Sequence, residues 1–313
     1  MEKINLCILG CGSVAKLHSR VARTMKSQVN LLYASRDLQK AQHYKRKFKG
    51  AGAFGSYEQA CASAEVHAVF ICTPHAHHLE HARLAAKYGK PMLIEKPITR
   101  TLDELAEIEA AADKAGVACM VAENYYFKPM VARLRTYLEA GVIGDPLFFE
   151  LNRSKRSNIS GWRADAEMMG GGALLEGGVH WLNLICSLAG EVDAVLAVRP
   201  DKPYKMVAPF EDSLEILLKF RNGSVGKMLH SWNISNRIGG LCWSKICGTE
   251  GNIQFESNGV VALVLGKKTR IAFPGFLDIM GYRQMLKHFI DCVRDNKQPA
   301  MSLQLARRDM AIV

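Results

Sequence analysis

The sequence lacks the features that would place the protein in a membrane or outside the cell. No apolar run in its 313 residues approaches the roughly 20 residues that a membrane-spanning helix needs. The N-terminal segment, MEKINLCILG, enters a strand-like pattern at once, without the basic region and cleavage site of a signal peptide. We therefore expect a cytoplasmic protein that has no membrane partner.

Paired cysteines are also missing, although the chain contains nine cysteines. They are scattered, they form no C-x-x-C pair, and most lie in apolar segments such as FICTP and NLICSLAG. This distribution argues against a disulfide framework and against a zinc site. His75, His77, His78 and His81 are close in sequence, but no carboxylate or cysteine joins them at ligand spacing. We expect reduced core cysteines and no metal.

The formal net charge is +11, which favours anionic partners. The basic residues are spread along the chain and match no recognised nucleic-acid motif, so we predict no nucleic-acid partner. A phosphorylated cofactor or an anionic substrate explains the sign equally well. The run RSKRS at 153–157 fits either an anion clamp or a solvated loop.

The first part of the chain alternates strand and helix patterns. Apolar runs at 4–9, 29–34, 66–72, 91–95 and 117–122 predict strands. A helix is predicted over 101–115, where Thr101 and Glu104 have capping-box spacing. Strands that alternate with helices predict βαβ units and a parallel sheet covered on both faces.

After residue 125 the pattern changes. Strands are predicted at 146–154, 212–220, 224–235, 252–256 and 260–266, and their alternation favours a mostly antiparallel sheet. Helices are predicted at 129–141, 172–189 and 281–295. The fold class is therefore α/β, with a dinucleotide-type domain over 1–124 and a second α/β domain over 125–313. The final helical pattern, LQLARRDMAIV, has no stop signal, and we expect this helix to run further.

A glycine pattern typical of dinucleotide binding follows the first strand. Gly10, Gly12 and Ala15 form G-x-G-x-x-A at the turn into the first helix, which begins near Ser13 and Val14. The first glycine permits the tight turn, the second lets the backbone approach a pyrophosphate, and the alanine allows close helix–strand packing. The pattern predicts a Rossmann domain, a doubly wound parallel sheet that binds NAD or NADP.

The end of the second strand indicates which dinucleotide binds. An NAD enzyme usually has an acidic residue there to hold the ribose 2′-hydroxyl, whereas this strand ends in Ser35 and Arg36. A hydroxyl and a guanidinium suit a 2′-phosphate. Asp37 fits the N-cap of the next helix. We predict that NADP(H) is favoured, and NAD(H) is the alternative.

Two further segments carry residues suited to catalysis. The strand before Glu95, Lys96 and Pro97 ends at the sheet edge where α/β proteins bind ligands, as does the strand before Thr73. In GGGALLEGGVHWLN, Glu176, His180 and Asn183 lie on one face of a helical pattern. A histidine beside a carboxylate suits proton transfer to or from a substrate hydroxyl.

These motifs, in the order GCGSVAKLH, TPHAHH, EKP, AENYYFKP and GWRADAEMMGGGALLEGGVHW, cover essentially the whole chain. The chain resembles the Gfo/Idh/MocA family, which includes glucose–fructose oxidoreductase, inositol dehydrogenase and dihydrodiol dehydrogenase. The resemblance implies a Rossmann domain, a second domain with a large open sheet that often forms a dimer interface, and NAD(P)-dependent oxidation or reduction of sugars, polyols or related carbonyls. We therefore predict a homo-dimer or homo-tetramer, with the aromatic residues of HSWNIS and CWSKIC covering a sheet face.

The resemblance also implies roles for individual residues. Lys96 and His180 would be catalytic together with Glu176, and Lys96, Arg163, Glu176, His180 and Asn183 would bind the substrate. The residues implied to contact the cofactor, beyond the glycine turn, are Thr73, Pro74, His75, His78, Glu95, Lys96, Asn124, Trp162 and Arg163.

The chain departs from the family pattern, which usually has Asp at Glu176 and Asn183, Asn at His75 and Arg at Tyr126. Two alternatives therefore stay open: a dinucleotide-binding regulatory protein without turnover, and an NAD-dependent glycosidase.

Overall fold

The computed structural model describes residues 2–201, 210–234 and 241–313. The chain forms two compact units. The first comprises Met1–Glu123 with Tyr282–Arg308, and the second Asn124–Gly281 with Asp309–Val313. None of the helices in the described ranges is long and apolar enough to cross a bilayer.

The first unit contains a six-stranded parallel sheet with the order β3-β2-β1-β4-β5-β6. Its strands are β1 (Ile4–Leu9), β2 (Val29–Ala34), β3 (Gly52–Phe54), β4 (Ala68–Ile71), β5 (Met92–Ile94) and β6 (Cys119–Val121). Its helices are α1 (Ser13–Arg23), α2 (Leu38–Phe48), α3 (Tyr57–Ala62), α4 (His78–Lys87), α5 (Leu102–Ala115) and α9 (Tyr282–Asp295), and a 3₁₀ turn spans His75–His77. This topology confirms the predicted doubly wound sheet.

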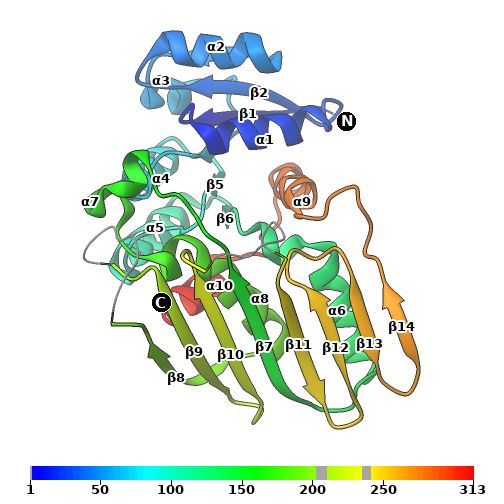
Figure 1. The fold of residues 1–313 in the computed structure, drawn as a ribbon. Helices are drawn as coiled ribbons and strands as arrows, with labels where there is room; N and C mark the ends of the chain where they lie inside the picture. The colour runs from blue at the N-terminus through cyan, green and yellow to red at the C-terminus, as the bar shows by residue number, and fades with distance from the viewer. Residues whose placement is uncertain (1, 202–209, 235–240) are drawn as a thin grey trace. The chain divides into compact units, whose positions relative to one another are not determined.

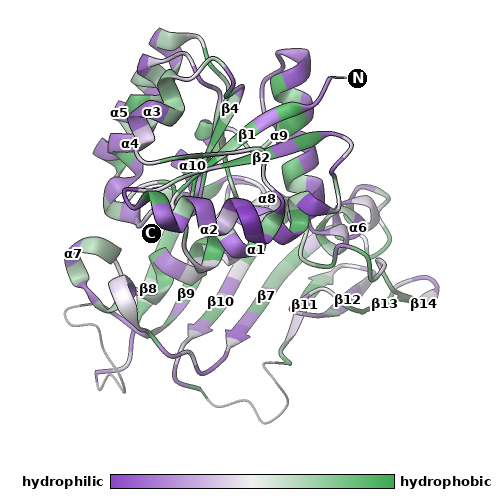
Figure 2. Ribbon diagram, turned by 90° about the horizontal axis from the view of Figure 1, so that it is seen from above, coloured by the Kyte–Doolittle hydropathy of each residue, from purple (hydrophilic) through white to green (hydrophobic). Residues whose placement is uncertain are grey.

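Helices cover both faces of this sheet, with α1 and α2 on one side and α4 and α5 on the other (Figure 2). β4 is buried along its whole length, as expected of a strand covered on both faces. The predicted helix starts are confirmed, because Asp37 accepts a hydrogen bond from the Gln39 amide and Thr101 accepts one from the Glu104 amide. The short edge strand β3 was not predicted.

The C-terminal segment requires a correction to the predicted domains. Residues 282–308 were assigned to the second domain, but they belong to the first unit. The apolar face of α9 packs on α1 and β1, and the ring of Tyr282 meets the edge of His18 at 5.5 Å. Arg307 of α10 (Leu303–Met310) donates a hydrogen bond of 3.0 Å to Glu109 of α5. A periodic helical pattern reveals a buried face but not which domain covers it.

The second unit is built on an eight-stranded sheet with the order β14-β13-β12-β11-β7-β10-β9-β8. β7 and β10 pair in parallel, and the other neighbours are antiparallel, which confirms the predicted mostly antiparallel sheet. The strands are β7 (Pro146–Ser154), β8 (Val192–Val198), β9 (Ser213–Phe220), β10 (Val225–Ser231), β11 (Trp243–Gly248), β12 (Gly251–Glu256), β13 (Ala262–Leu265) and β14 (Thr269–Ala272).

Helices α6 (Pro129–Glu139) and α8 (Val179–Ala189) lie along one face of this sheet (Figure 1). On β9, Leu214, Ile216, Leu218 and Phe220 point into the core between the sheet and the helices, while the residues between them are more exposed. The remaining helical segments are α7 (Ala166–Met169), 3₁₀ turns at Asn124–Phe127 and Gly161–Ala164, and a π-helical turn at Leu174–Gly178. The predicted helix over 172–189 is therefore a π-helical turn followed by α8.

Candidate active site

The glycine turn between β1 and α1 is shaped by two glycines in different ways. Gly10 has φ of +99°, and a Cβ there would lie 2.9 Å from the carbonyl oxygen of Cys72, so the fold itself requires glycine. At Gly12 a Cβ would have no atom within 4 Å. The protein therefore does not need glycine at position 12 for its own packing, and the open space beside this backbone fits a ligand that approaches closely.

The start of α1 is suited to a phosphate group. Its N-cap is Gly12, with no side-chain hydrogen bond to the first amides, and its first turn has no acidic residue. Unpaired amides at a helix N-terminus favour an anion. Ser13 and Val14 form this turn, Ala15 is fully buried against the sheet, and the Tyr44 hydroxyl donates a 2.9 Å hydrogen bond to the Gly12 carbonyl. These residues fit the pyrophosphate of a dinucleotide.

At the end of β2 the predicted pair is divided between core and surface. Ser35 is buried and its hydroxyl accepts a hydrogen bond from the Asp37 amide at 3.2 Å, while Arg36 is exposed. The Asp37 carboxylate caps α2. The rings of Tyr57 and His81 meet edge-on at 4.4 Å. Burial lowers the pKa of His81 to about 4, and the charges of His77, His78 and Arg36 act in the same direction.

The loop after β4 is tied to the loop after β5 by His78. This side chain is fully buried, and its ring nitrogens lie 3.0 Å from the carbonyl oxygen of Thr73 and 3.1 Å from those of Pro97 and Ile98. Burial lowers the pKa of His78. The imidazole is therefore enclosed by protein groups, and the predicted contact of His78 with a cofactor stays a prediction. Its ring fixes the two loops that flank Lys96.

Other residues of this rim are also used within the unit. The Thr73 hydroxyl lies 3.0 Å from Nδ1 of His81, His75 is buried with its ring 5.6 Å from that of His78, and Pro74 is half-buried. Lys96 is half-buried and its peptide bond to Pro97 is cis. Lys96 is thus the charged side chain that the EKP segment leaves partly exposed.

Glu95 has a partner that sequence reasoning missed. Its carboxylate lies 2.5 Å from Nε2 of His18 on α1, and its second oxygen accepts a hydrogen bond from the Lys96 amide at 3.1 Å. Burial acts to raise the pKa of Glu95, but the hydrogen bond from His18 and the charges of His18, Lys96 and His78 outweigh it, so the pKa is lowered. The ionised carboxylate therefore holds the backbone at Lys96 in place.

In the second unit, the π-helical turn carries Glu176, and His180 follows on the first turn of α8. Glu211 holds the start of this segment: its carboxylate accepts from the Leu174 amide at 2.8 Å, and its carbonyl accepts from the Ala173 amide at 2.8 Å. A Cβ at Gly172 would lie 2.1 Å from the Glu211 carboxylate. The glycine run before Glu176 thus allows close approach of Glu211, which the sequence did not indicate.

Arg163 and Glu176, each predicted to bind substrate, form an ion pair that was not predicted, since the sequence indicated His180 as the neighbour of Glu176. The Arg163 guanidinium donates to the Glu176 carboxylate at 2.6 Å and lies 4.4 Å from the ring centroid of Trp162. Glu176 is buried, whereas His180, Trp162 and Arg163 are partly exposed. His180 stacks on Tyr125, with ring centroids 4.5 Å apart and planes 14° from parallel. This unit therefore presents a partly exposed imidazole stacked on a tyrosine ring, and a guanidinium paired with a buried carboxylate.

Two predicted ligand contacts are occupied by internal hydrogen bonds. Asn183 is fully buried and donates to Asp309 at 2.6 Å, and its contact with substrate stays a prediction. Asn124 is also buried and donates to the Met280 carbonyl at 2.6 Å, and its contact with the cofactor stays a prediction. Both amides hold chain segments together. Within the described ranges, no group of three His, Cys, Asp or Glu residues is placed to hold a metal ion.

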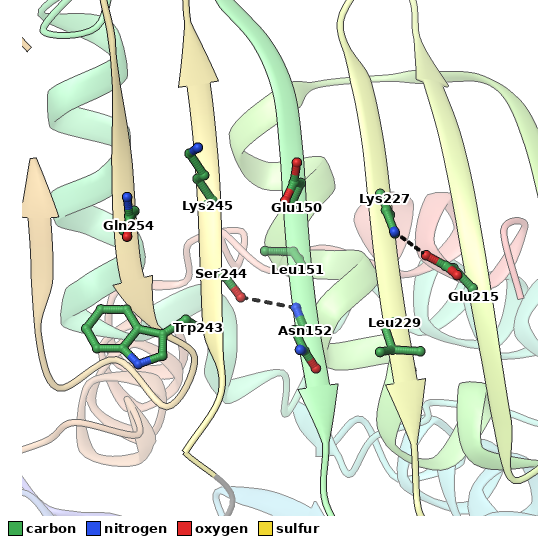
Figure 3. Close-up of a pocket in the computed structure, with 10 residues that line it drawn as sticks. All are labelled: Glu150, Leu151, Asn152, Glu215, Lys227, Leu229, Trp243, Ser244, Lys245 and Gln254. Carbon is green, nitrogen blue, oxygen red and sulfur yellow. Dashed lines mark hydrogen bonds and ion pairs between the residues drawn. The ribbon is translucent and has the colours of Figure 1, made fainter. Parts of the chain in front are cut away.

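The face of the eight-stranded sheet opposite α6 and α8 carries a second surface feature, which we call the open face. One cross-strand row on it runs through the sheet from β8 to β14, consisting of Leu196, Leu217, Lys227, Glu150, Lys245, Gln254, Leu263 and Ile271. Figure 3 shows its central charged residues side by side, with Trp243 next to them. Leu196, Leu217, Trp243 and Ile271 are 45–65% exposed. The row is therefore charged in the middle and apolar at both ends.

Comparison with known proteins identifies relatives along most of the chain. The model of an oxidoreductase family with an NAD-binding Rossmann fold, GFO_IDH_MocA, matches residues 4–123. The model of the GFO/IDH/MocA C-terminal domain matches residues 131–254. Levoglucosan dehydrogenase of Pseudarthrobacter phenanthrenivorans is 28% identical over 291 residues, 82% of this chain and 74% of the relative. Trans-1,2-dihydrobenzene-1,2-diol dehydrogenase of Mus musculus is 28% identical over 279 residues, 85% of this chain and 79% of the relative.

Solved structures show the same architecture. A levoglucosan dehydrogenase in complex with NADH and L-sorbose superimposes with a TM-score of 0.89 at 25% identity, covering 100% of this chain and 96% of that chain. A shorter match, 30% identical over 135 residues (42% of this chain and 38% of the relative), is to D-xylose 1-dehydrogenase [NADP(+)] of Haloarcula marismortui.

Proposed function

The chain belongs to the Gfo/Idh/MocA family of oxidoreductases with an NAD-binding Rossmann fold, and from this premise we propose that it moves a hydride between a nicotinamide dinucleotide and a small sugar-like or polyol substrate. Family membership confirms the resemblance and the oxidoreductase class predicted from the motifs. The substrate, the roles of individual residues, the preferred dinucleotide and the assembly state are proposals.

The chemical proposal rests on the π-helical turn Leu174–Gly178 together with the start of α8 in the second unit, which we call the catalytic turn. Arg163 forms an ion pair with the buried Glu176 on a turn that Glu211 holds in place, and the partly exposed His180 follows four residues later in the chain. A dehydrogenase or reductase must remove a proton from, or return one to, the substrate oxygen. An imidazole titrates near neutral pH and suits that task.

A bound nicotinamide dinucleotide supplies the hydride donor or acceptor. The residues that would hold it are the glycine turn at Gly10 and Gly12, with the first turn of α1 at its phosphates. His180 accepts the hydroxyl proton in oxidation and donates it in reduction. Lys96, the partly exposed cation of the first unit, suits hydrogen bonding to a substrate oxygen and stabilisation of negative charge on it, and Arg163 with Glu176 suits the orientation of a polar substrate.

The relatives support the choice of substrate class. Their names specify an anhydrosugar, a pentose and a cyclic diol, each of which carries a secondary hydroxyl group or its equivalent on a ring. We propose that this chain acts on a CH–OH group of a compound of the same size. The test is a screen of the purified protein with levoglucosan, L-sorbose, D-xylose and a trans-dihydrodiol, with each dinucleotide, following nicotinamide absorbance.

Two variants make the screen decisive. Lys96→Met should keep dinucleotide binding but lose about 100-fold or more in turnover, and His180→Ala should do the same, as expected for loss of a group that acts on the reacting oxygen. Unchanged turnover in either variant refutes the assigned role. Tight dinucleotide binding without turnover of any substrate would favour the non-catalytic alternative. Glycoside hydrolysis without net change of the dinucleotide would favour the glycosidase alternative.

For the dinucleotide, we propose a preference for NADP(H). Arg36 is the exposed cation at the end of β2, and the Asp37 carboxylate already caps α2. Relatives of both kinds exist, since one is named for NADP(+) and another was solved with NADH. Paired fluorescence titrations should show tighter NADPH than NADH binding. Arg36→Ala should weaken NADPH binding by about tenfold, as for loss of one charge-assisted contact, and leave NADH binding within about twofold. Lys47→Ala, an exposed cation on the last turn of α2, is the control.

We also propose that two copies of the chain associate through the open face. The exposed apolar side chains at both ends of the row favour burial against a partner, and a two-fold interface pairs a surface with itself. The central Lys227, Glu150 and Lys245 alternate in sign, which suits self-association. Leu217→Glu should convert the assembly to a smaller species in sedimentation velocity. Leu38→Glu, an equally exposed leucine on α2, should not. A monomeric parent chain would refute the proposal.

A further inference from the structure

Lys128 is a buried lysine close to the proposed catalytic histidine. It is 1% exposed, and its ammonium lies 4.1 Å from the ring centroid of Tyr125 and 5.9 Å from that of Trp181. Lysines are rarely buried to this extent, because removing an ammonium from water is costly unless other groups replace the solvent. The aromatic faces provide part of that replacement through cation–π attraction.

The surroundings of Lys128 show that this position is built into the fold. The residue is the N-cap of α6, and its amide donates to the Tyr125 carbonyl at 3.2 Å. Gly259, in the connection between β12 and β13, packs on the side chain, and a Cβ there would lie 3.3 Å from Cε of Lys128. Gly281 packs on the backbone, where a Cβ would lie 2.8 Å from the Lys128 amide nitrogen. Two close glycine contacts therefore enclose one lysine.

Tyr125 connects this lysine to the catalytic turn. Its ring contacts the Lys128 ammonium and also stacks on the His180 imidazole at 4.5 Å and 14°. The edge of Trp181 meets the same ring at 5.1 Å and 82°. An aromatic ring that is held by a cation and an indole leaves a stacked imidazole little freedom to turn. The plane in which His180 presents its nitrogens is thus restrained by the Tyr125 ring.

We propose that Lys128 and Tyr125 are positioning residues for His180: the buried ammonium fixes the Tyr125 ring, and the ring fixes the imidazole in the orientation that proton transfer needs. This inference rests on the proposed proton-transfer role of His180. Neither residue needs to touch the substrate. Their contribution appears in the chemical step, because a proton transfer depends steeply on the alignment of the donor and the acceptor.

The kinetic test compares four single variants. Lys128→Met removes the charge at similar length, whereas Lys128→Arg keeps it. Tyr125→Leu removes the ring, whereas Tyr125→Phe keeps it. Lys128→Met and Tyr125→Leu should lower kcat by about tenfold, which corresponds to about 1.4 kcal/mol, and leave KM within about twofold. The two conservative variants should retain most of kcat. The Lys128→Met/Tyr125→Leu double variant should be little worse than Tyr125→Leu, because the lysine acts through the ring.

A second readout does not depend on turnover. The chain has ten histidines, and with ¹³C-labelled histidine the His180 signal is identified by its absence in His180→Gln. In the parent protein, stacking on Tyr125 should move the His180 ring protons upfield. Tyr125→Leu should abolish that displacement, Lys128→Met should reduce it, and Tyr125→Phe and Lys128→Arg should preserve it.

The outcomes separate this inference from the proposed function. If His180→Gln keeps full turnover, the proposed function fails, while the spectra still report whether Lys128 and Tyr125 position the ring. If Lys128→Met leaves both kcat and the His180 signal unchanged, the inference is overturned. A lower melting temperature with the parent kcat and the parent His180 signal also overturns it, because the lysine then serves stability alone.

Discussion

The two glycines at the start of α1 give a sharp test of the dinucleotide site, because the same substitution should have opposite consequences at each. At Gly10, alanine faces φ of +99° and a Cβ contact of 2.9 Å with the Cys72 carbonyl oxygen. The unfavourable backbone conformation costs about 1–2 kcal/mol. Overpacking against a fixed main chain adds about 1–3 kcal/mol. Gly10→Ala should therefore destabilise the protein by about 2–5 kcal/mol.

At Gly12 the fold tolerates the methyl group. The backbone has φ of −110° and ψ of −171°, which any residue adopts, and the Cβ meets no atom within 4 Å. Replacing glycine lowers the entropy of the unfolded chain, a gain of about 0.4–1 kcal/mol. Alanine is a poorer N-cap than glycine by a similar amount. The two effects nearly cancel, so Gly12→Ala should change the free energy of unfolding by less than about 1 kcal/mol.

The assay is thermal unfolding paired with fluorescence titration of NADPH. Gly10→Ala should lower the melting temperature by several degrees, at roughly 2–4 °C per kcal/mol for a chain of this size class. Gly12→Ala should have nearly the same melting temperature as the parent protein. It should bind NADPH at least about tenfold more weakly, because the methyl group occupies the space beside the phosphates. If Gly12→Ala bound NADPH as tightly as the parent protein, the dinucleotide would not lie against this turn.

Three further predictions concern ion pairs and buried histidines. Arg163→Met should lower the free energy of unfolding by about 1–3 kcal/mol in chemical denaturation, because it removes a charged hydrogen bond from the buried Glu176. The double variant with Glu176→Gln should recover much of that loss, and additive effects of the two substitutions would refute the coupling. The pKa of His81 is about 4 in the folded protein and near 6.5 in the unfolded chain. The stability contributed by the neutral imidazole is therefore fully present above about pH 6.5. As the pH falls towards 4, the free energy of unfolding should decrease by up to about 3 kcal/mol. His81→Gln should flatten the stability profile in that window, and an unchanged slope would contradict the assignment. The pKa of Glu95 is lowered in the folded protein by its contact with His18. The stability that this carboxylate contributes is therefore present above its unfolded pKa, about 4.5, and is lost as the pH falls through the folded pKa. Urea titrations at pH 3 and pH 6 should show that Glu95→Gln loses less stability between pH 6 and pH 3 than the parent protein does.

The sequence predicted the parallel sheet well because its strands are buried on both faces. β1 and β2 begin and end at the predicted residues, since continuous apolar runs bounded by glycine or polar residues leave little ambiguity. β3 has only Gly-Ala-Phe and lies at an edge, and its half-buried residues have no periodicity to detect. β8 was missed for a related reason: most of its residues are exposed on both sides, so the apolar–polar alternation of a half-buried strand is absent.

The sequence singled out residue types suited to the chemistry, but it did not reveal which residues contact them. Lys96, His180, Arg163 and Glu176 were all singled out, whereas the ion pair between Arg163 and Glu176 was not predicted. His18 and Glu211 were not, although each holds a predicted residue or the turn that carries it. Both are distant in sequence from the group they contact, and only the folded chain brings them together. Asn183 was predicted to face substrate because helical spacing places it with His180, but that spacing does not reveal that Asp309 occupies its amide.

Three residues of the motifs have internal roles that the sequence does not reveal. His78, Asn124 and Asn183 belong to segments that carry the family resemblance, yet each is 0–1% exposed and its described hydrogen bonds join protein groups. A buried polar group needs a partner, so losing it would leave the other group unsatisfied at about 1–3 kcal/mol, and selection retains it without any ligand. Lys96 and His180, in contrast, remain partly exposed. Exposure in the folded unit, added to the motif, therefore favours these two over the enclosed residues as candidates for reaction with substrate.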